Sequence, residues 1–216
     1  MVKRFSVVLV LLVVIAGGAF ALPEFGLSAG AGGYFTSDFG GGVDISASGY
    51  GSLGSVKTPY IGGGGFLFFD GTFAELSAGF FAAGGNWKTS DQSIESDFFG
   101  LGIDISLLGK FPFEINDQFS VFPLLGATYR IVVSAKADGE KVDDPMDLSA
   151  IWFKAGGGLD FSFTDNFFLR GELLYGIRLK NKFESDLIDL AAGSQATVKA
   201  LLGHGLEVKI GVGYRF

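Results

Sequence analysis

The last eleven residues, Leu206-Glu-Val-Lys-Ile-Gly-Val-Gly-Tyr-Arg-Phe216, decide the fold because they alternate between two kinds of side chain. One set is apolar throughout and consists of Leu206, Val208, Ile210, Val212, Tyr214 and Phe216. The other set is small or charged and consists of Glu207, Lys209, Gly211, Gly213 and Arg215. A period of two indicates a β-strand with two different faces. An apolar face opposite small and charged residues is typical of a membrane barrel, with lipid outside and a polar lumen inside.

Earlier segments repeat this alternation. The segments 24–32, 99–113, 121–134, 151–163 and 166–180 carry apolar residues at one parity and small, polar or charged residues, Ser134 among them, at the other. The Gly- and Phe-rich segments 60–69 and 72–84 leave the register of 60–84 open, although Glu75 faces inward if Leu76 faces outward. The inner faces together are predicted to carry eleven charged residues: Glu75, Asp104, Lys110, Arg130, Lys154, Asp160, Arg170, Glu172, Arg178, Glu207 and Lys209.

The connections between these segments alternate in length. Three short turns are expected, at Asp70-Gly71, Asn116-Asp117 and Asp165-Asn166. Four long polar connections are expected, at 36–59, 86–97, 137–149 and 184–200. Membrane barrels place short turns in the periplasm and long loops outside the cell, with an even number of strands. The sequence therefore predicts an all-β protein, an eight-stranded antiparallel up-and-down transmembrane β-barrel with short periplasmic turns and long extracellular loops.

The aromatic residues support this arrangement. Many Phe residues lie within a few positions of the short turns or the C-terminus, where the aromatic girdle of a barrel belongs. A second outer ring is expected near the long connections and would include Tyr34 and Trp152.

Composition narrows the function further. The chain has 216 residues, of which 48% are hydrophobic and only 18% are charged, against about 25% charged in an ordinary soluble domain. There is no Cys, which excludes disulfides, thiolate metal sites and thiol catalysis. The formal net charge of −7 argues against a nucleic-acid partner, whose phosphates a protein must neutralise.

The first residues predict export. Met1-Val-Lys-Arg4 is a basic n-region, Val7 to Ile15 is unbroken and apolar, and Ala19-Phe-Ala21 is an A-x-A cleavage site. This pattern is typical of a secretory signal peptide. Residues 1–21 are therefore expected to be a cleaved signal peptide, and residues 22–216 the barrel domain.

With these features, the chain resembles the small eight-stranded outer-membrane barrels of the OmpA/OmpX/OmpW type, and its ending Gly213-Tyr-Arg-Phe216 is similar to the OmpW branch. The resemblance implies residence in the outer membrane of a diderm bacterium, with the loops extracellular. It also implies that the barrel-assembly machinery reads a terminal aromatic with alternating apolar residues before it, here Val208, Ile210, Val212, Tyr214 and Phe216. The family includes narrow channels, adhesion or defence proteins and lipid-modifying enzymes.

Catalytic and cofactor motifs are weak. Gly49-Tyr-Gly51-Ser-Leu-Gly54 spells G-x-G-x-x-G, but it lies in a long connection and not between a strand and a helix. His204 is the single His and has no evident nucleophile beside it. The acidic segment 137–149 is expected to be a solvated loop, with calcium bridging as the alternative. No enzyme activity, cofactor or metal site is predicted.

Three functions remain compatible with the sequence. The first is a narrow channel or conduit for small, apolar solutes, with 184–200 forming a short amphipathic helix over its mouth. The second is a non-conducting structural or surface-interaction barrel with a salt-bridged lumen, and the third is a lipid-modifying enzyme. Channel and sealed barrel differ in whether the inner bases, Arg130, Lys154, Arg170 and Arg178, have acidic partners at their own height. Expected partners are outer-membrane lipid, the assembly machinery, periplasmic chaperones and an apolar solute.

Overall fold

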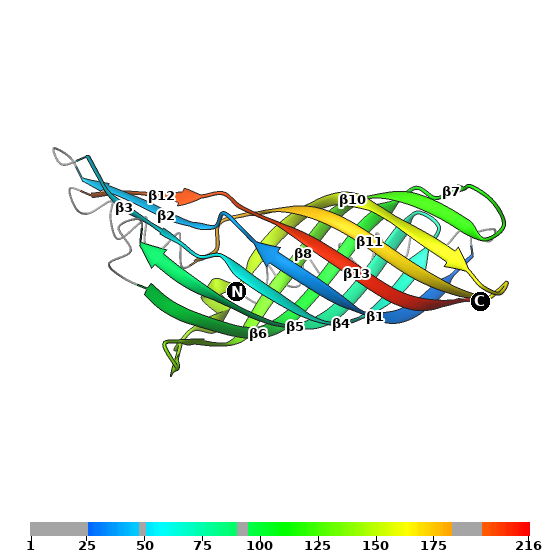
Figure 1. Ribbon diagram of the computed structural model, residues 1–216, viewed down its shortest axis with the longest axis horizontal. Helices are drawn as coiled ribbons and strands as arrows, with labels where there is room; N and C mark the ends of the chain where they lie inside the picture. Colours follow the sequence, from blue (N-terminus) through cyan, green and yellow to red (C-terminus); the bar gives the residue numbers. More distant parts are fainter. Residues whose placement is uncertain (1–25, 48–50, 90–94, 183–195) are drawn as a thin grey trace, which may run out of the picture.

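The computed structural model describes residues 26–47, 51–89, 95–182 and 196–216. The predicted signal peptide lies outside the described residues. Eight long strands form the barrel (Figure 1): β1 (Ser28–Asp38), β4 (Tyr60–Gly71), β5 (Ala74–Thr89), β6 (Glu95–Lys110), β8 (Phe119–Ala137), β10 (Ala150–Ser162), β11 (Phe167–Arg178) and β13 (Gly203–Arg215).

The barrel is closed. Each of the eight strands pairs antiparallel with its neighbours in the chain, and β1 pairs with β13 to complete the ring. The closing register runs from Ser28 opposite Arg215 to Thr36 opposite Glu207, and the amide of Phe216 donates to the carbonyl of Leu27 at 2.9 Å. The predicted fold class is thereby confirmed. The described residues include no helix whose length and hydrophobicity would let it span a membrane.

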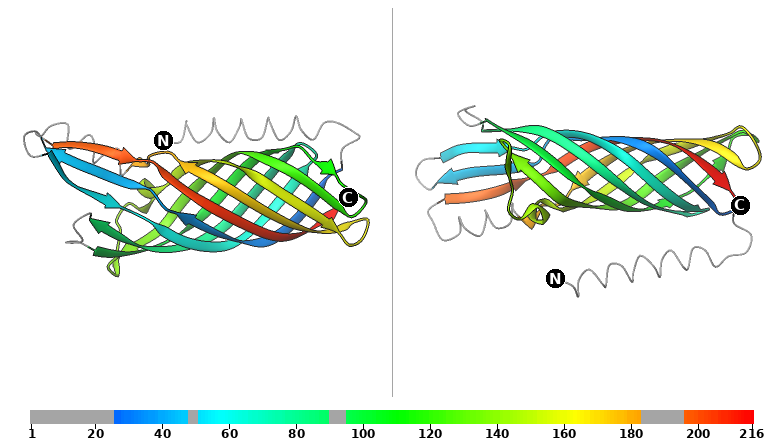
Figure 2. Two further views of the ribbon diagram at one scale, coloured as in Figure 1. Left: turned by 45° about the horizontal axis from the view of Figure 1, so that its top comes forward. Right: turned by 90° about the horizontal axis from the view of Figure 1, so that it is seen from below.

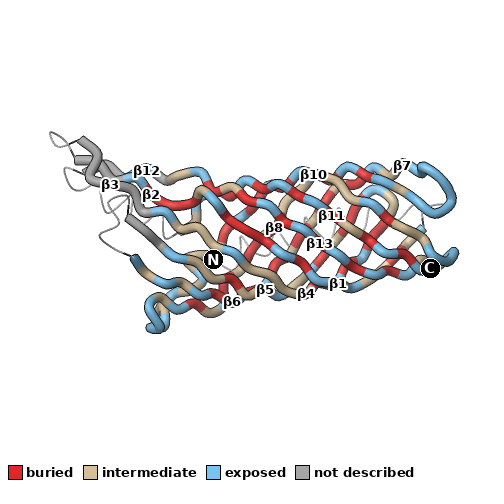
Figure 3. The backbone as a smooth tube through the Cα atoms, in the orientation of Figure 1, coloured by how far each residue is buried: buried red, intermediate tan, exposed pale blue. Residues whose placement is uncertain are grey.

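The strands bury one parity and expose the other. Figure 3 shows buried and exposed residues alternating along each strand of the barrel. On β13 the exposed set is the apolar one, from Leu206 to Tyr214, while Glu207 and Lys209 are buried. Since apolar side chains point outward and charged ones inward, the barrel is built inside out relative to a soluble protein.

Aromatic residues form a ring at the end of the barrel that carries the short turns, here called the turn end. Phe119 contacts Phe161 with ring centroids 4.9 Å apart, and Tyr214 lies between Phe167 at 5.0 Å and Phe216 at 5.4 Å. The prediction for the second ring was wrong at Tyr34 and Trp152, which are 8% and 3% exposed and point inward.

One predicted turn also needs correction. Asp70 and Gly71 are the last residues of β4, opposite Glu75 and Ala74, and the turn itself is formed by residues 72–73. The strand continues through Asp70 because its carboxylate is held inside the barrel by Lys110 and Arg170, both at 2.6 Å.

At the opposite end, here called the loop end, a small sheet extends beyond the barrel (Figure 2). It consists of β2 (Gly42–Ala47), β3 (Gly51–Lys57) and β12 (Ala196–Leu201), in the order β12-β2-β3. Strand β3 joins it to the barrel through Val56 opposite Thr89 and Lys57 opposite Lys88 of β5. The described part of segment 36–59 is therefore largely paired β-structure and not a loop. Of the expected helix in 184–200, residues 184–195 lie outside the described residues and Val198 lies in β12.

Segment 137–149 is also more ordered than a loop. Strand β8 turns at Asp138 and Gly139, whose φ angles of 52° and 82° suit a two-residue hairpin turn, into β9 (Glu140–Lys141). A short 3-10 helix, η1 (Pro145–Leu148), follows. At the turn end, β7 (Phe113–Glu114) pairs with the start of β8.

Candidate functional site

The candidate site is the charged interior of the barrel. The structure places all eleven predicted residues there, and none is more than 6% exposed. Two further acids, Asp38 and Asp70, are buried with them at 1% and 4% exposure. Sequence reasoning missed both because it assigned them to a long loop and a turn. Their parity was the available signal, since Asp38 shares it with Thr36 and Asp70 shares it with Phe68, which are both buried.

Near the turn end, Arg170 organises the network. Its guanidinium binds Asp160, directly opposite on β10, through two hydrogen bonds of 2.8 Å. The same group contacts Asp70 at 2.6 Å and Glu75 at 2.8 Å. Lys110 binds Asp70 at 2.6 Å and lies 3.8 Å from Asp160. Charge-assisted hydrogen bonds of this length tie strands β4, β5, β6, β10 and β11 together across the lumen.

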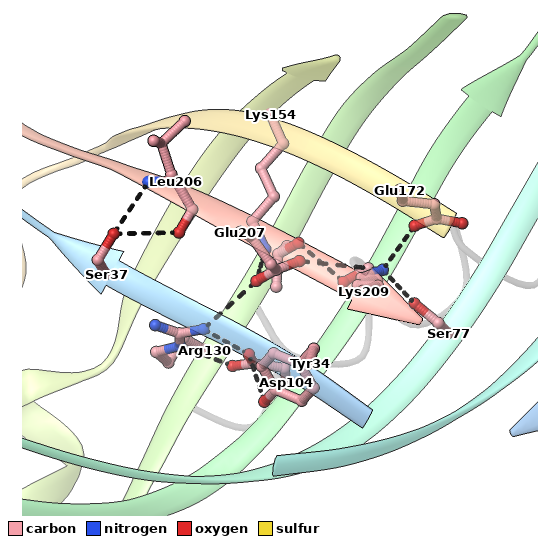
Figure 4. A network of polar contacts seen from close by, with 12 residues as sticks. Tyr34, Ser37, Ser77, Asp104, Arg130, Lys154, Glu172, Leu206, Glu207 and Lys209 are labelled. Atoms are coloured by element: carbon pink, nitrogen blue, oxygen red, sulfur yellow. Dashed lines mark hydrogen bonds and ion pairs between the residues drawn. The ribbon is translucent and has the colours of Figure 1, made fainter. Parts of the chain in front are cut away.

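At mid-height, Lys209 lies among three carboxylates. Its ammonium is 3.4 Å from Glu172, directly opposite on β11, 3.7 Å from Glu75 and 3.9 Å from Glu207. It also donates a hydrogen bond to the Ser77 hydroxyl at 3.4 Å. Figure 4 shows Lys209 between Glu172 on one side and Glu207 on the other. Lys209 thus connects the lower cluster to the upper one.

The upper cluster centres on Arg130 and Glu207 (Figure 4). Arg130 binds Asp104, its cross-strand partner on β6, through hydrogen bonds of 2.8 and 2.6 Å. The Tyr34 hydroxyl donates to the same carboxylate at 3.0 Å. Lys154 reaches across β11 to Glu207 at 2.7 Å, and Arg130 lies 3.7 Å from that carboxylate.

A separate ion pair lies at the loop end of the lumen. Arg178 binds Asp38 at 3.0 Å, and both side chains are buried. The other oxygen of Asp38 accepts hydrogen bonds from the amides of Gly40 and Gly41 at 3.2 Å. A side chain at Gly41 would overlap the Arg178 guanidinium and displace it.

Aromatic rings fill the space between the charges. Four inward Phe residues each lie over an inward glycine directly opposite on the neighbouring strand, in the pairs Phe68 with Gly30, Phe81 with Gly102, Phe122 with Gly158 and Phe168 with Gly213. A Cβ on any of these glycines would overlap the ring. The rings also contact the bases: Lys110 lies 4.2 Å from the Phe122 centroid, and Arg170 lies 4.7 Å from that of Phe68.

The described residues enclose one small cavity at mid-height. The cavity bounded by Tyr34, Phe66, Asp104 and Lys209 measures about 10 Å³, the scale of a single water molecule. A vestibule of about 340 Å³ lies at the turn end and is lined by Asp70, Lys110, Asp160 and Arg215 among others. A third hollow of about 640 Å³ lies on the outer wall, between Leu159, Leu173 and Ile210.

The remaining predicted residues lie away from the lumen. Val208, Ile210, Val212, Tyr214 and Phe216 are all exposed on the outer surface. His204 lies at the loop end between Phe39 and Tyr175, with ring centroids 6.0 and 6.1 Å away. Within the described ranges, no group of three or more His, Asp or Glu side chains is arranged to hold a metal ion.

These features define the class of protein. A closed antiparallel barrel satisfies every backbone group between its strands, which is what a lipid environment requires. An apolar outer band, an aromatic ring at the short turns and a charged interior complete the architecture of a bacterial outer-membrane barrel. The chain is an outer-membrane β-barrel of a Gram-negative-type bacterium, so the turn end faces the periplasm and the loop end faces outward.

Comparison with protein-family models finds no match, and comparison with curated proteins finds none. Among solved structures, Ail, the attachment invasion locus protein of Yersinia pestis, is 19% identical over 88% of this chain and 99% of its own, with a TM-score of 0.38. OprG of Pseudomonas aeruginosa is 14% identical over 88% and 96%, with a TM-score of 0.48. Neisserial surface protein A is 18% identical over 87% and 99%, with a TM-score of 0.42. Likenesses at this level of identity concern the fold alone. The chain is identified as an outer-membrane barrel by the features of its own barrel.

Proposed function

We propose that this protein is a non-conducting outer-membrane barrel that acts through its extracellular end. One observation carries the proposal: each of the four bases that distinguish a channel from a sealed barrel has an acidic partner at its own height. The pairs are Arg130 with Asp104, Lys154 with Glu207, Arg170 with Asp160 and Arg178 with Asp38. Buried charges that satisfy one another across a narrow interior stabilise the closed arrangement and leave none free to guide a solute.

A channel would need a continuous path through the same interior. The mid-height cavity of about 10 Å³ is far below the volume that a solute or a hydrated ion requires. An eight-stranded interior is only wide enough for its own side chains, and here the inward Phe residues occupy the space over the glycines. The lumen therefore supports the sealed alternative over the conduit.

The extracellular end supplies the surface through which such a barrel would act. Strands β2, β3 and β12 form a sheet that extends beyond the barrel (Figure 1), and β12 is at the end of the strand order in the described part of the chain. Segment 137–149 adds a second feature with exposed carboxylates at Asp138, Glu140, Asp143 and Asp144. Binding residues are often carried by protruding segments held on a rigid scaffold. A surface-interaction role, such as adhesion or defence, fits this arrangement.

Two measurements test the proposal. Refolded mature protein in a planar bilayer should give no discrete openings, while a known porin in the same bilayer gives its usual conductance. Cells with and without the protein should take up a small apolar solute at the same rate. Discrete openings, or uptake that depends on the protein, would restore the conduit.

We also propose that the outward face of β13 is the assembly signal. Phe216 is 74% exposed, and its ring contacts Tyr214 at a centroid distance of 5.4 Å. The barrel-assembly machinery and periplasmic chaperones are the partners that would read this face before the strand closes against β1. Replacing Phe216 with Ala should lower the yield of folded barrel in the outer membrane, whereas Phe111→Ala, which changes a similarly exposed aromatic at the same end, should not.

No catalytic role is proposed for His204. Its ring packs between Phe39 and Tyr175 at the extracellular end of the lipid-facing surface, which is the usual place for aromatic residues at a membrane boundary. The His204→Phe variant is expected to fold and to behave as the wild type in the conductance and uptake assays.

A further inference from the structure

The charges buried in the lumen do not balance. The described interior holds seven carboxyl groups, on Asp38, Asp70, Glu75, Asp104, Asp160, Glu172 and Glu207. It holds six cations, on Lys110, Arg130, Lys154, Arg170, Arg178 and Lys209. An unbalanced charge in a dry interior is costly, so the surplus carboxylate must be neutralised or compensated.

The surplus lies in the lower half of the barrel. At the loop end, Arg178 balances Asp38, and in the upper cluster Arg130 and Lys154 balance Asp104 and Glu207. Below them, three buried cations face four carboxyl groups: Lys110, Arg170 and Lys209 face Asp70, Asp160, Glu75 and Glu172. One more cation, Arg215, is half-buried at the turn end, where it donates to the Ser162 hydroxyl at 2.7 Å and lies over the Phe168 ring.

Within this half, the buried oxygens that accept no hydrogen bond lie on Glu172, Glu75 and Asp70, and the Asp70 carboxylate is already held by Lys110 and Arg170, each at 2.6 Å. Neither oxygen of Glu172 accepts a hydrogen bond, and Oε1 of Glu75 accepts none either. Both side chains are 0% exposed, and both lie beside the Lys209 ammonium, Glu172 at 3.4 Å and Glu75 at 3.7 Å. Two buried carboxylates that share one ammonium at this distance favour the binding of a proton between them.

We propose that Glu75 and Glu172 bind one proton between them, so that the folded barrel contains a neutral carboxyl group at neutral pH. The proton supplies the missing donor and removes the surplus charge. It resides on Glu172, because Glu75 already accepts a hydrogen bond from Arg170 at 2.8 Å through Oε2. Like-charged carboxylates in contact share a proton for the same reason elsewhere in proteins.

All charged groups around the pair agree with this placement. Lys209 on β13 and Arg170 on β11 contact the pair directly, and Lys110 on β6 acts on Glu75 from below. Arg170 and Lys110 are shared with Asp70 on β4 and Asp160 on β10, and Lys209 is shared with Glu207. None of these cations is left over to neutralise Glu172 alone.

The proton-binding site makes the lumen sensitive to alkaline pH. The folded barrel holds one proton that the same two residues lose in the unfolded chain at neutral pH, so their contribution to stability falls as the pH rises. At pH values below the range in which carboxyl groups ionise in water, the folded and unfolded states both hold the proton. The contribution of the pair to stability then does not change with pH. Loss of the proton leaves two adjacent carboxylates facing one ammonium, which favours loosening of the network around Lys209.

Infrared spectroscopy of the refolded wild type tests the proposal directly. The carbonyl stretch of a protonated carboxyl group is resolved from those of carboxylates and amides. We expect one such band at neutral pH, present in detergent and in lipid vesicles and lost at alkaline pH. The Glu172→Gln variant should lack the band, because Gln replaces the neutral acid with a neutral amide of the same shape.

Glu207→Gln is the matched control, since it removes a carboxylate that is paired with Lys154 at 2.7 Å. It should keep the band and unfold at a lower urea concentration than the wild type. At mildly acidic pH, Glu172→Gln should unfold at the same urea concentration as the wild type. As the pH rises, it should unfold at increasingly higher urea concentrations than the wild type. Absence of the band from the wild type at neutral pH would overturn the proposal, as would its persistence in Glu172→Gln. The wild-type spectrum decides the question even if a variant fails to fold.

Discussion

At the residue scale, the side chain on which most of the interior depends is Arg170. It is 1% exposed and contacts three carboxylates, on Asp70, Glu75 and Asp160. Its guanidinium also lies over the rings of Phe68, Phe122 and Phe168. A planar group with five donors suits this position, whereas a lysine could not make the paired hydrogen bonds to Asp160.

Replacing Arg170 with Met should therefore cost about 3–5 kcal/mol of unfolding free energy, because it leaves buried carboxylates without their partner. Urea unfolding in lipid vesicles measures the change. Lys182→Met is the control: its ion pair with Asp147 is 2.8 Å long, but the lysine side chain is 54% exposed, so we expect a loss below about 1 kcal/mol. Equal losses in the two variants would mean that the interior network does not stabilise the barrel.

The Phe–Gly pairs give a second prediction at this scale. Gly158→Ala places a methyl group against the Phe122 ring and should destabilise the barrel by about 1–3 kcal/mol. Gly171→Ala is its control on the next strand, where the nearest atom to a new Cβ is Leu159 at 4.0 Å. The control should unfold at the same urea concentration as the wild type or a higher one, and the reverse order of stability would contradict the account.

Parity predicted the inward charges from the sequence, because each inner position follows from counting along an alternating strand. The prediction failed at positions where residue type was given more weight than parity. Tyr34 and Trp152 have inward parity, yet their aromatic character suggested the outer ring. The interior also needs large rings, since its many glycines leave space that only aromatic side chains fill. Asp38 and Asp70 were missed for a similar reason, because the Gly residues that follow them suggested a loop and a turn.

At the element scale, the strands are predictable and their irregularities are not. The pairing of β6 with β8 shifts between Leu101 and Gly102, which places Ser134 opposite the outward Leu101 and leaves Ala135 1% exposed. The sequence predicted Ser134 inside. One extra residue in a strand reverses the faces beyond it, and the local sequence of Val and Ile gives no sign of such a bulge.

The extracellular hairpin of β2 and β3 is separable from the barrel. Its two ends meet where the amide of Thr58 donates to the carbonyl of Gly41 at 2.9 Å. Replacing residues 42–57 with a short Gly-Ser linker should leave the urea midpoint of the barrel unchanged, while any binding by the extracellular end is lost. A matched replacement within β11 should abolish folding. If the barrel without the hairpin fails to fold, the extension is part of the barrel and not an addition to it.

At the scale of the whole molecule, the barrel combines an apolar exterior with an interior that satisfies its own charges. The alternation along each strand predicts which residues face the lumen, but which of them meet depends on how far neighbouring strands are staggered. Lys154 and Glu207 lie on strands separated by β11, so their 2.7 Å contact is set by barrel closure and by no local pattern. That is why the sequence could not choose between a channel and a sealed barrel.

The measurement that tests the sealed lumen most directly is the reactivity of a thiol placed inside it. The chain has no Cys, so each variant carries a single thiol. Ser106 is 4% exposed, lies beside the mid-height cavity and is 2.8 Å from the Thr128 hydroxyl. Asp143, exposed in segment 137–149, provides the control position.

In lipid vesicles, a charged thiol reagent in the water should modify the Asp143→Cys variant quickly and leave the Ser106→Cys variant unmodified until the barrel is unfolded. Modification of both variants at similar rates in the folded state would show that water and solutes reach mid-height, and would contradict the account.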